Sequence, residues 1–110
     1  TEVSSVLIAT AMALAGHKVY FYSMINFVAF RPFEAVRNGI HCHKANVKLL
    51  GVAGSSGYRF LGFSHNQLFE DEDIYHLKPY MECYTPKTNM EVEGVIKTTY
   101  AKRSASYIRL

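Results

Sequence analysis

Runs of apolar residues alternate along this chain between a helical and an extended spacing. Residues 4–15 are rich in Ala, Leu and Ile, with apolar side chains on almost every side, so they predict a buried helix. Ser4 or Ser5 is expected to cap its start. Gly16 is expected to end it, because glycine readily adopts the left-handed conformation that follows many helices. Residues 18–24 are aromatic and β-branched, which predicts the first strand.

The remaining elements continue this alternation. Proline is tolerated in the first turn of a helix, so a second helix is predicted from Arg31 or Pro32 to residue 43. The side chains expected to point inward from it are Phe33, Val36, Ile40 and Cys42. Further strands are predicted at 47–53, 81–85 and 107–110, with a weak helix at 68–78. An amphipathic helix is predicted at 89–102, with an inner face formed by Val92, Val95, Ile96 and Tyr100.

Strands that alternate with helices favour an α/β fold in three layers, with a mostly parallel sheet, helices on both faces and right-handed crossovers. In such a sheet the carboxyl ends of the strands share one edge, where ligands bind. Two predicted loops lie at that edge. One is the aromatic stretch after Met24, and the other is Gly-Ser-Ser-Gly at 54–57, which leads to His65. The second loop lacks the residues of a P-loop or a dinucleotide site, so a flexible turn is the simpler interpretation.

Phe27, Phe30 and Phe33 cluster where a strand is predicted to end and a helix to begin. Phenylalanines at this spacing most often belong to an ordinary core. At the ligand edge of a sheet, the same rings can instead form a floor for a flat ring, because aromatic groups pack in offset or edge-on arrangements. The pattern leaves both interpretations open.

Composition narrows the class of protein and its partners. The 110 residues are 49% hydrophobic and 19% charged, which is typical of one globular domain. The net charge of +3 comes from scattered basic residues, so neither nucleic acid nor an anionic membrane is an expected partner. No apolar run reaches the roughly 18 residues of a membrane span. The dense block of charge in the sequence is acidic, at 70–73.

Cys42 and Cys83 are far apart in sequence and have apolar neighbours, so they are expected to be reduced core residues of a cytoplasmic protein. His41 and His43 flank Cys42, which raises the question of a metal site. Neighbours two positions apart on a helix point away from each other, so no metal site is expected here.

A series of short motifs extends over nearly the whole chain. They are Ala-Leu-Ala-Gly-His-Lys-Val at 13–19, Tyr-Ser at 22–23, Phe-x-x-Phe-Arg-Pro-Phe-Glu-x-Val-Arg-Asn at 27–38, Val-Lys-x-x-Gly-Val at 47–52, Leu-Gly-x-Ser-His-Asn at 61–66 and Tyr-Ile-Arg-Leu at 107–110. Their order and spacing resemble the pyrimidine-binding domain of transketolase-like thiamine diphosphate enzymes, the group of transketolase and deoxyxylulose-phosphate synthase. The resemblance implies a partial thiamine diphosphate-binding fold: a single domain over 1–110 that lacks the family's first strand, from a C-terminal-half subunit or fragment.

The resemblance also implies site residues. The family's glutamate near the start of its first helix matches Glu2, and its Thr-His pair matches Ser64 and His65, so Glu2 and His65 are the expected catalytic residues. In the family, that carboxyl group bonds N1′ of the cofactor's pyrimidine ring, which requires the raised pKa of a glutamate in an apolar pocket. The aromatic residues that pack on the aminopyrimidine ring match Phe27, Phe30 and Phe33.

A further implication of the resemblance is that the chain acts with a partner. The family's diphosphate- and Mg²⁺-binding domain carries a Gly-Asp-Gly…Asn pattern that this sequence lacks, and the family's active site lies between two chains. The expected function is therefore the pyrimidine-binding part of an enzyme that transfers a two-carbon ketol unit from a sugar phosphate or related ketose. The expected assembly is a homo- or hetero-oligomer in which a partner domain or subunit holds the diphosphate and Mg²⁺.

Two alternatives stay open. The family has Gln and Asn after its glutamate, whereas this chain has Val3 and Ser4. That difference and the missing first strand favour a non-catalytic relative that serves as an assembly or regulatory module. A β-type subunit of a 2-oxoacid dehydrogenase shares the fold, but the motifs at 31–38 and 61–65 look less like that branch.

Overall fold

The computed structural model describes residues 1–52 and 57–110. Within them, four strands form one sheet in the order β1-β2-β4-β3, and every neighbouring pair is parallel. The strands are β1 (Val19–Met24), β2 (Val47–Val52), β3 (Glu82–Tyr84) and β4 (Ser106–Arg109). Val19 pairs with Val47, and Lys48 pairs with Ser106. The parallel α/β sheet predicted from the sequence is confirmed, and each strand lies close to its predicted position.

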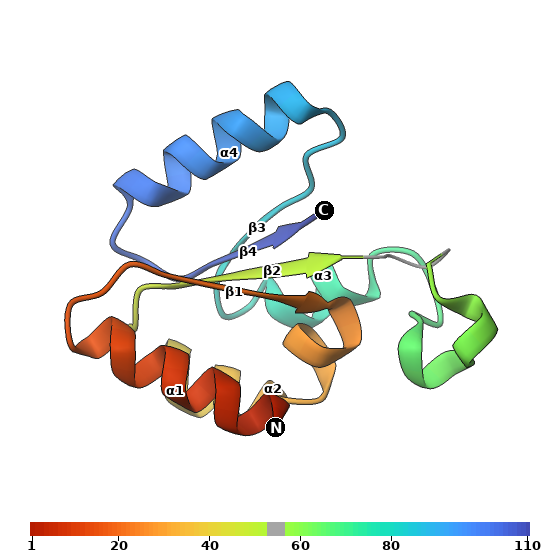
Figure 1. The fold of residues 1–110 in the computed structure, drawn as a ribbon, viewed down its shortest axis with the longest axis horizontal. Coiled ribbons are helices and arrows are strands. Elements are labelled where there is room, and N and C mark those ends of the chain that lie inside the picture. The colour runs from red at the N-terminus through yellow and green to blue at the C-terminus, as the bar shows by residue number, and fades with distance from the viewer. Residues whose placement is uncertain (53–56) are drawn as a thin grey trace.

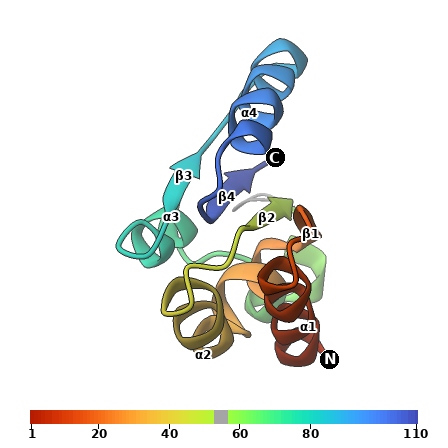
Figure 2. The same ribbon diagram turned by 90° about the vertical axis from the view of Figure 1, so that its left-hand side faces the viewer.

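Helices cover both faces of the sheet, as predicted. Figures 1 and 2 show α1 (Glu2–Leu14), α2 (Phe33–Ala35) and α3 (Glu72–Leu77) on one side of the strands. α4 (Asn89–Ala101) lies across the opposite side. The buried core fills the space between the first group of helices and the sheet, and its largest fully buried side chains include Ile25, Ile40, Leu49, Leu77 and Tyr107. The helices are short; within the described residues, none is long and apolar enough to cross a bilayer.

The first helix lies where it was predicted, but the prediction that it is buried all round is wrong. Val6 and Ala9 face the core, whereas Leu7 and Ile8 are 49% and 61% exposed. The outer side of this helix therefore presents apolar side chains to solvent. Its N-cap is Thr1 and not Ser4 or Ser5.

The connection from β1 to β2 is more helical than the sequence indicated. Two π-helical segments, η1 (Asn26–Phe30) and η2 (Val36–His41), flank α2, and Pro32 is the N-cap of α2. The helical path thus begins at η1, before Pro32. π-Helical turns are rare in proteins and are frequently found at functional sites.

The altered helical spacing explains a wrong prediction. Cys42 is exposed, at the carboxyl-terminal cap of η2, and not part of the core. Hydrogen bonds in a π-helix join residues five apart, so the α-helical period that placed Cys42 inward does not apply to η2. Cys83 is half-buried in β3, and both thiols are free. Burial raises the pKa of Cys83 to about 11, and the Asp73 carboxylate adds to this effect.

Two further predictions concern α4 and the glycine-rich turn. Tyr100 of α4 was expected to face inward but is 53% exposed, while its neighbour Thr99 is fully buried. The Tyr100 ring instead lies under the Lys18 ammonium, whose nitrogen is 3.5 Å from the ring centre.

The predicted glycine-rich turn at 54–57 lies outside the described residues except for Gly57. The end of the predicted second strand, at residue 53, also lies outside them.

Candidate functional site

The residues singled out from the sequence lie around η1, just beyond the carboxyl end of β1. Figure 1 shows η1 beside the segment that follows residue 57, which contains two short 3₁₀ turns, η3 (Arg59–Leu61) and η4 (Phe63–His65). Both are located at the edge of the sheet toward which the parallel strands point. Ligands of open α/β sheets bind at this edge.

Phe27 and His65, which are far apart in sequence, are in contact. Their rings meet edge to face, with centroids 5.3 Å apart and planes at 86°. Both side chains are half-buried, so neither ring is sealed inside the core. Asn26, next to Phe27, donates a hydrogen bond of 3.0 Å to the carbonyl of Asn66, next to His65. The carboxyl end of β1 and the segment carrying the histidine are therefore held together at two adjacent positions.

Glu2 reaches the same region from the start of α1. Its Oε2 lies 2.9 Å from Nε of Arg31, the residue that follows Phe30, and its side chain is 26% exposed. A hydrogen bond from its own backbone and the Arg31 guanidinium hold the pKa of Glu2 below its ordinary value. In this single chain, Glu2 is thus an ion-paired carboxylate at the surface, whereas the family's role for it requires a raised pKa.

Phe30 and Phe33 contact a different imidazole from the one that Phe27 contacts. Their rings face His76 of α3, with centroids 5.3 Å and 4.0 Å from the imidazole. Phe33 also meets Tyr80 edge to face at 5.3 Å. The predicted aromatic residues therefore form two groups: Phe27 with His65, and Phe30 and Phe33 around His76.

Buried amides beside the Phe27–His65 contact were not singled out from the sequence. Both amide atoms of Gln67 and the Oδ1 atom of Asn26 are buried without a hydrogen-bond partner in the described part of the chain. An unsatisfied buried polar group costs about 1 to 3 kcal/mol, so such atoms are uncommon away from sites that bind water or ligands. The available signal was the amide pair Asn66-Gln67 that directly follows the histidine.

A charged network lies at the same edge of the sheet, at the carboxyl end of β4. Asp73, fully buried in α3, accepts hydrogen bonds from the Tyr107 hydroxyl and from Nη1 of Arg109 at 3.0 Å. Nη2 of Arg109 also lies 2.6 Å from Asp71. Burial and the Asp73 carboxylate raise the pKa of Tyr107 well above its ordinary value. The sequence indicated only an acidic block here; the structure shows that one of its members is the buried link between α3 and β4.

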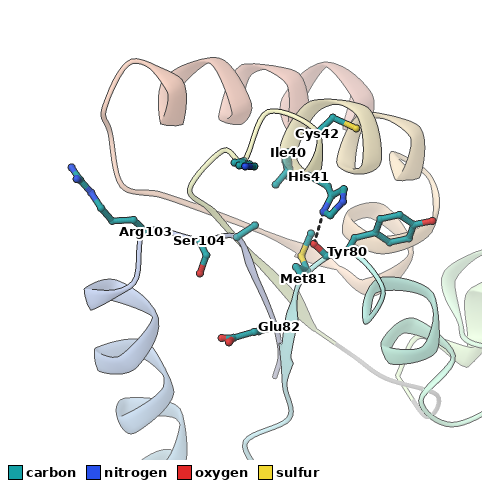
Figure 3. A pocket seen from close by; sticks show the side chains of 10 residues that line it. Ile40, His41, Cys42, Tyr80, Met81, Glu82, Arg103 and Ser104 are labelled. Carbon is teal, nitrogen blue, oxygen red and sulfur yellow. Dashed lines mark hydrogen bonds between the residues drawn. The ribbon is translucent and has the colours of Figure 1, made fainter.

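A cavity of about 670 Å³ lies at the opposite, amino-terminal edge of the sheet, as Figure 3 shows. Residues from the end of η2, the start of β3 and the turn before β4 line it, among them Ile40, Met81 and Glu82. His41 points across toward the Tyr80 carbonyl, and its Nδ1 lies 2.8 Å from that oxygen. Over the described residues, no three His, Cys, Asp or Glu side chains are grouped so as to hold a metal ion. The cavity is separate from the predicted site residues.

Comparison with known proteins identifies the class. The model of the transketolase pyrimidine-binding domain family matches residues 1–110, so the chain belongs to this family. It is 28% identical over 109 residues to an apulose-4-phosphate transketolase subunit of Phocaeicola vulgatus, a match that covers 99% of this chain and 35% of that protein. Among solved structures, a split gene transketolase described as an inactive beta4 tetramer superimposes with a TM-score of 0.86 at 24% identity. That match covers all of this chain and 34% of the other, and it supports the fold.

Proposed function

We propose that this chain is the pyrimidine-binding part of a split, transketolase-like enzyme that transfers a two-carbon ketol unit from a ketose phosphate with thiamine diphosphate. A partner domain or subunit holds the diphosphate and Mg²⁺. The observation that carries the proposal is the contact between Phe27 and His65 at the carboxyl edge of the sheet, in a chain of this family. The Glu2 carboxylate forms an ion pair with Arg31, which directly follows η1, the segment that contains Phe27.

The relatives favour a function shared between chains. One is named as a subunit of an apulose-4-phosphate transketolase, and apulose 4-phosphate is a ketose phosphate. This chain spans about a third of that protein's length, since the match covers 35% of it. The remaining parts of the catalytic machinery therefore have to come from other segments or chains.

The residues at the carboxyl edge of the sheet carry the kinds of chemical group that could bind the pyrimidine end of the cofactor. Phe27 offers an aromatic edge, Glu2 offers a carboxyl group, and the amides of Asn26 and Gln67 have unused donors and acceptors. When bound, thiamine diphosphate supplies carbanion chemistry that no side chain provides. The protein's contribution is to place the ring, exclude water and hold protons at defined atoms.

Within this proposal, each residue has a separate task. Glu2 would hydrogen-bond N1′ of the bound ring and hold a proton there, which requires an environment that raises the pKa of Glu2. Phe27, Phe30 and Phe33 bound the ring and exclude water. His65 donates a proton to the carbonyl oxygen of the sugar and takes one back, as a half-buried imidazole beside the site can do.

The outer side of α1 supports the need for a partner. Val3, Leu7, Ile8 and Met12 on this helix are each more than 40% exposed, and Glu2 lies at its start. A partner that covers this side of the helix would remove water from these apolar side chains. Glu2 shares the helix face of the core residue Val6, so the raised pKa that its proposed role requires would have to come from a ligand or partner that removes water at the start of the helix.

The experiment compares Glu2→Ala with Glu93→Ala in the full-length protein combined with its partner. Glu93 is an exposed residue of α4, paired with Lys97, and serves as the control. Glu2→Ala is expected to lower ketol transfer from apulose 4-phosphate by about a hundredfold or more, because it removes a proton-holding group. Glu93→Ala should leave the rate unchanged. Turnover that survives in Glu2→Ala would exclude the mechanism. Calorimetry that detects no Mg²⁺-dependent thiamine diphosphate binding with any partner would favour the non-catalytic module.

A further inference from the structure

His76 is a titratable residue that the proposed chemistry does not use, yet it is the shared neighbour of two predicted ring-binding residues. It lies on α3, and its imidazole centroid is 4.0 Å from that of Phe33 and 5.3 Å from that of Phe30. Phe30 and Phe33 are half-buried side chains that pack against the core, and Phe33 also meets Tyr80. The imidazole is a contact that both phenylalanine rings share.

The surroundings of His76 suit a neutral ring. Its Nε2 is buried and has no hydrogen-bond partner within the described residues. Burial lowers the pKa of His76 below its ordinary value, and the carboxylate of Glu72, one turn earlier on α3, opposes this in part. Glu72 already accepts a hydrogen bond of 2.7 Å from the backbone of Leu68.

Two other titratable groups belong to this aromatic cluster. Tyr80 contacts Phe33 edge to face, and His41 contacts Tyr80. Within the described residues, neither forms a hydrogen bond with the buried Nε2 of His76. Phe30 and Phe33 carry no charge themselves.

We propose that neutral His76 is a positioning residue: it holds Phe30 and Phe33 in the orientation in which they receive the pyrimidine ring, and its protonation releases them. The consequence for the cofactor rests on the proposed function; the coupling between His76 and the two rings does not. A protonated imidazole needs water or acceptors for both N–H groups, and the buried Nε2 of His76 has neither within the described residues. Attraction between the cation and the aromatic faces is weaker than the hydration lost at that N–H group. The protonated ring therefore moves toward solvent, and the two phenylalanines lose their support.

The first test needs no cofactor. NMR spectra of the protein, recorded from pH 7.5 to pH 5, follow the imidazole signals of His76 and the ring signals of Phe30 and Phe33. We expect the phenylalanine signals to shift with the same midpoint as His76, and this midpoint to lie below the ordinary value for histidine. Ring signals that stay constant while His76 titrates would overturn the proposal, as would a midpoint of His76 at or above that ordinary value.

The second test measures the functional consequence. Dissociation constants for thiamine diphosphate are measured with Mg²⁺ and the partner, in the wild type, His76→Leu and the control His17→Leu. Leucine keeps an apolar side chain beside the two phenylalanines but has no titratable group. Ionisation of thiamine diphosphate affects both proteins equally, so it cancels in the ratio of the wild-type dissociation constant to that of His76→Leu. This ratio is expected to rise by about threefold or more between pH 7.5 and pH 5, because only the wild type gains a proton at this position. His17→Leu should follow the wild type.

A ratio that does not change with pH would overturn the positioning role, even if the NMR coupling exists. If the wild type binds no thiamine diphosphate at any pH, the proposed function fails, and the NMR titration still decides whether His76 controls the two rings. The two outcomes are therefore distinguishable.

Discussion

At the scale of single residues, Gly51 shows how closely the sheet is packed under the site. A Cβ atom on Gly51 would lie 2.5 Å from the hydroxyl of Tyr107 and 3.1 Å from a side-chain carbon of Ile25. Both neighbours are fully buried, so neither can move aside without disturbing the core. The absence of a side chain at Gly51 is what lets the Tyr107 hydroxyl reach Asp73.

We therefore expect Gly51→Ala to lower the free energy of unfolding by about 1 to 3 kcal/mol, as overpacking of a core does. Gly94→Ala is the matched control, because a Cβ on Gly94 meets nothing within 4 Å in the exposed part of α4. That substitution should stabilise the protein by about 0.5 to 1 kcal/mol, through helix propensity. Urea denaturation of both variants checks this. Equal effects of the two substitutions would contradict the packing argument.

Single residues were predictable from the sequence where a local motif marked them. Phe27 and His65 fall in short motifs, and the structure brings these two rings together. Asp73 was not predicted as a buried residue, because its partners Tyr107 and Arg109 lie more than thirty positions away. Burial of a carboxylate depends on partners that only the folded chain supplies.

At the scale of elements, α3 is attached to β4 through polar contacts. Asp73 of α3 receives hydrogen bonds from Tyr107 and Arg109 of β4, and Asp71 just before α3 pairs with Arg109. The segment that carries His65 leads directly into α3. The position of the histidine is therefore coupled to this polar attachment.

Tyr107→Phe removes one hydrogen bond to the buried carboxylate and leaves the Arg109 contact in place. We expect it to destabilise the protein by about 1.5 to 3 kcal/mol, the usual contribution of a hydrogen bond to a charged group. Hydrogen exchange should show the largest loss of protection in α3. Tyr75→Phe on the same helix is the control, because Tyr75 is 70% exposed. Similar destabilisation by both variants would mean that the hydroxyl of Tyr107 contributes nothing specific.

Whole elements were easier to predict than their details. Strands such as β2 are mostly apolar stretches between turn residues, so their positions follow from the sequence alone. The π-helical form of η1 and η2 was not predictable, because residue spacing distinguishes helix from strand and not one helix type from another. Because the sequence could not show that η2 is π-helical, Cys42 was wrongly predicted to point into the core.

At the scale of the whole molecule, the apolar outer side of α1 is the surface that the proposed function assigns to a partner. A double substitution, Ile8→Glu with Met12→Glu, places two charges on this side of the helix, where both residues are exposed in the single chain. The fold should be retained, because neither side chain belongs to the buried core. Association with the partner should weaken more than tenfold, since burial of one large apolar side chain contributes about 1.5 to 3 kcal/mol.

Size-exclusion chromatography and calorimetry of the mixed chains check this expectation. Met90→Glu is the control, because Met90 is 83% exposed on α4, on the opposite side of the sheet. Equal weakening by the double substitution and by Met90→Glu would indicate that charge, and not the α1 surface, governs association. No weakening by the double substitution would show that the partner docks elsewhere.

The order of the strands also constrains how this domain forms during synthesis. β4, which follows the other three described strands along the chain, inserts between β2 and β3, and among the described strands β3 has no partner except β4. Parallel neighbours cannot form a hairpin, so each pairing waits for its intervening helix. While β4 is still inside the ribosome, β2 of the nascent chain is paired on one side only. β3 then has none of the backbone hydrogen bonds that it forms with β4 in the folded sheet. Until then, the growing chain depends on protection from aggregation at that edge.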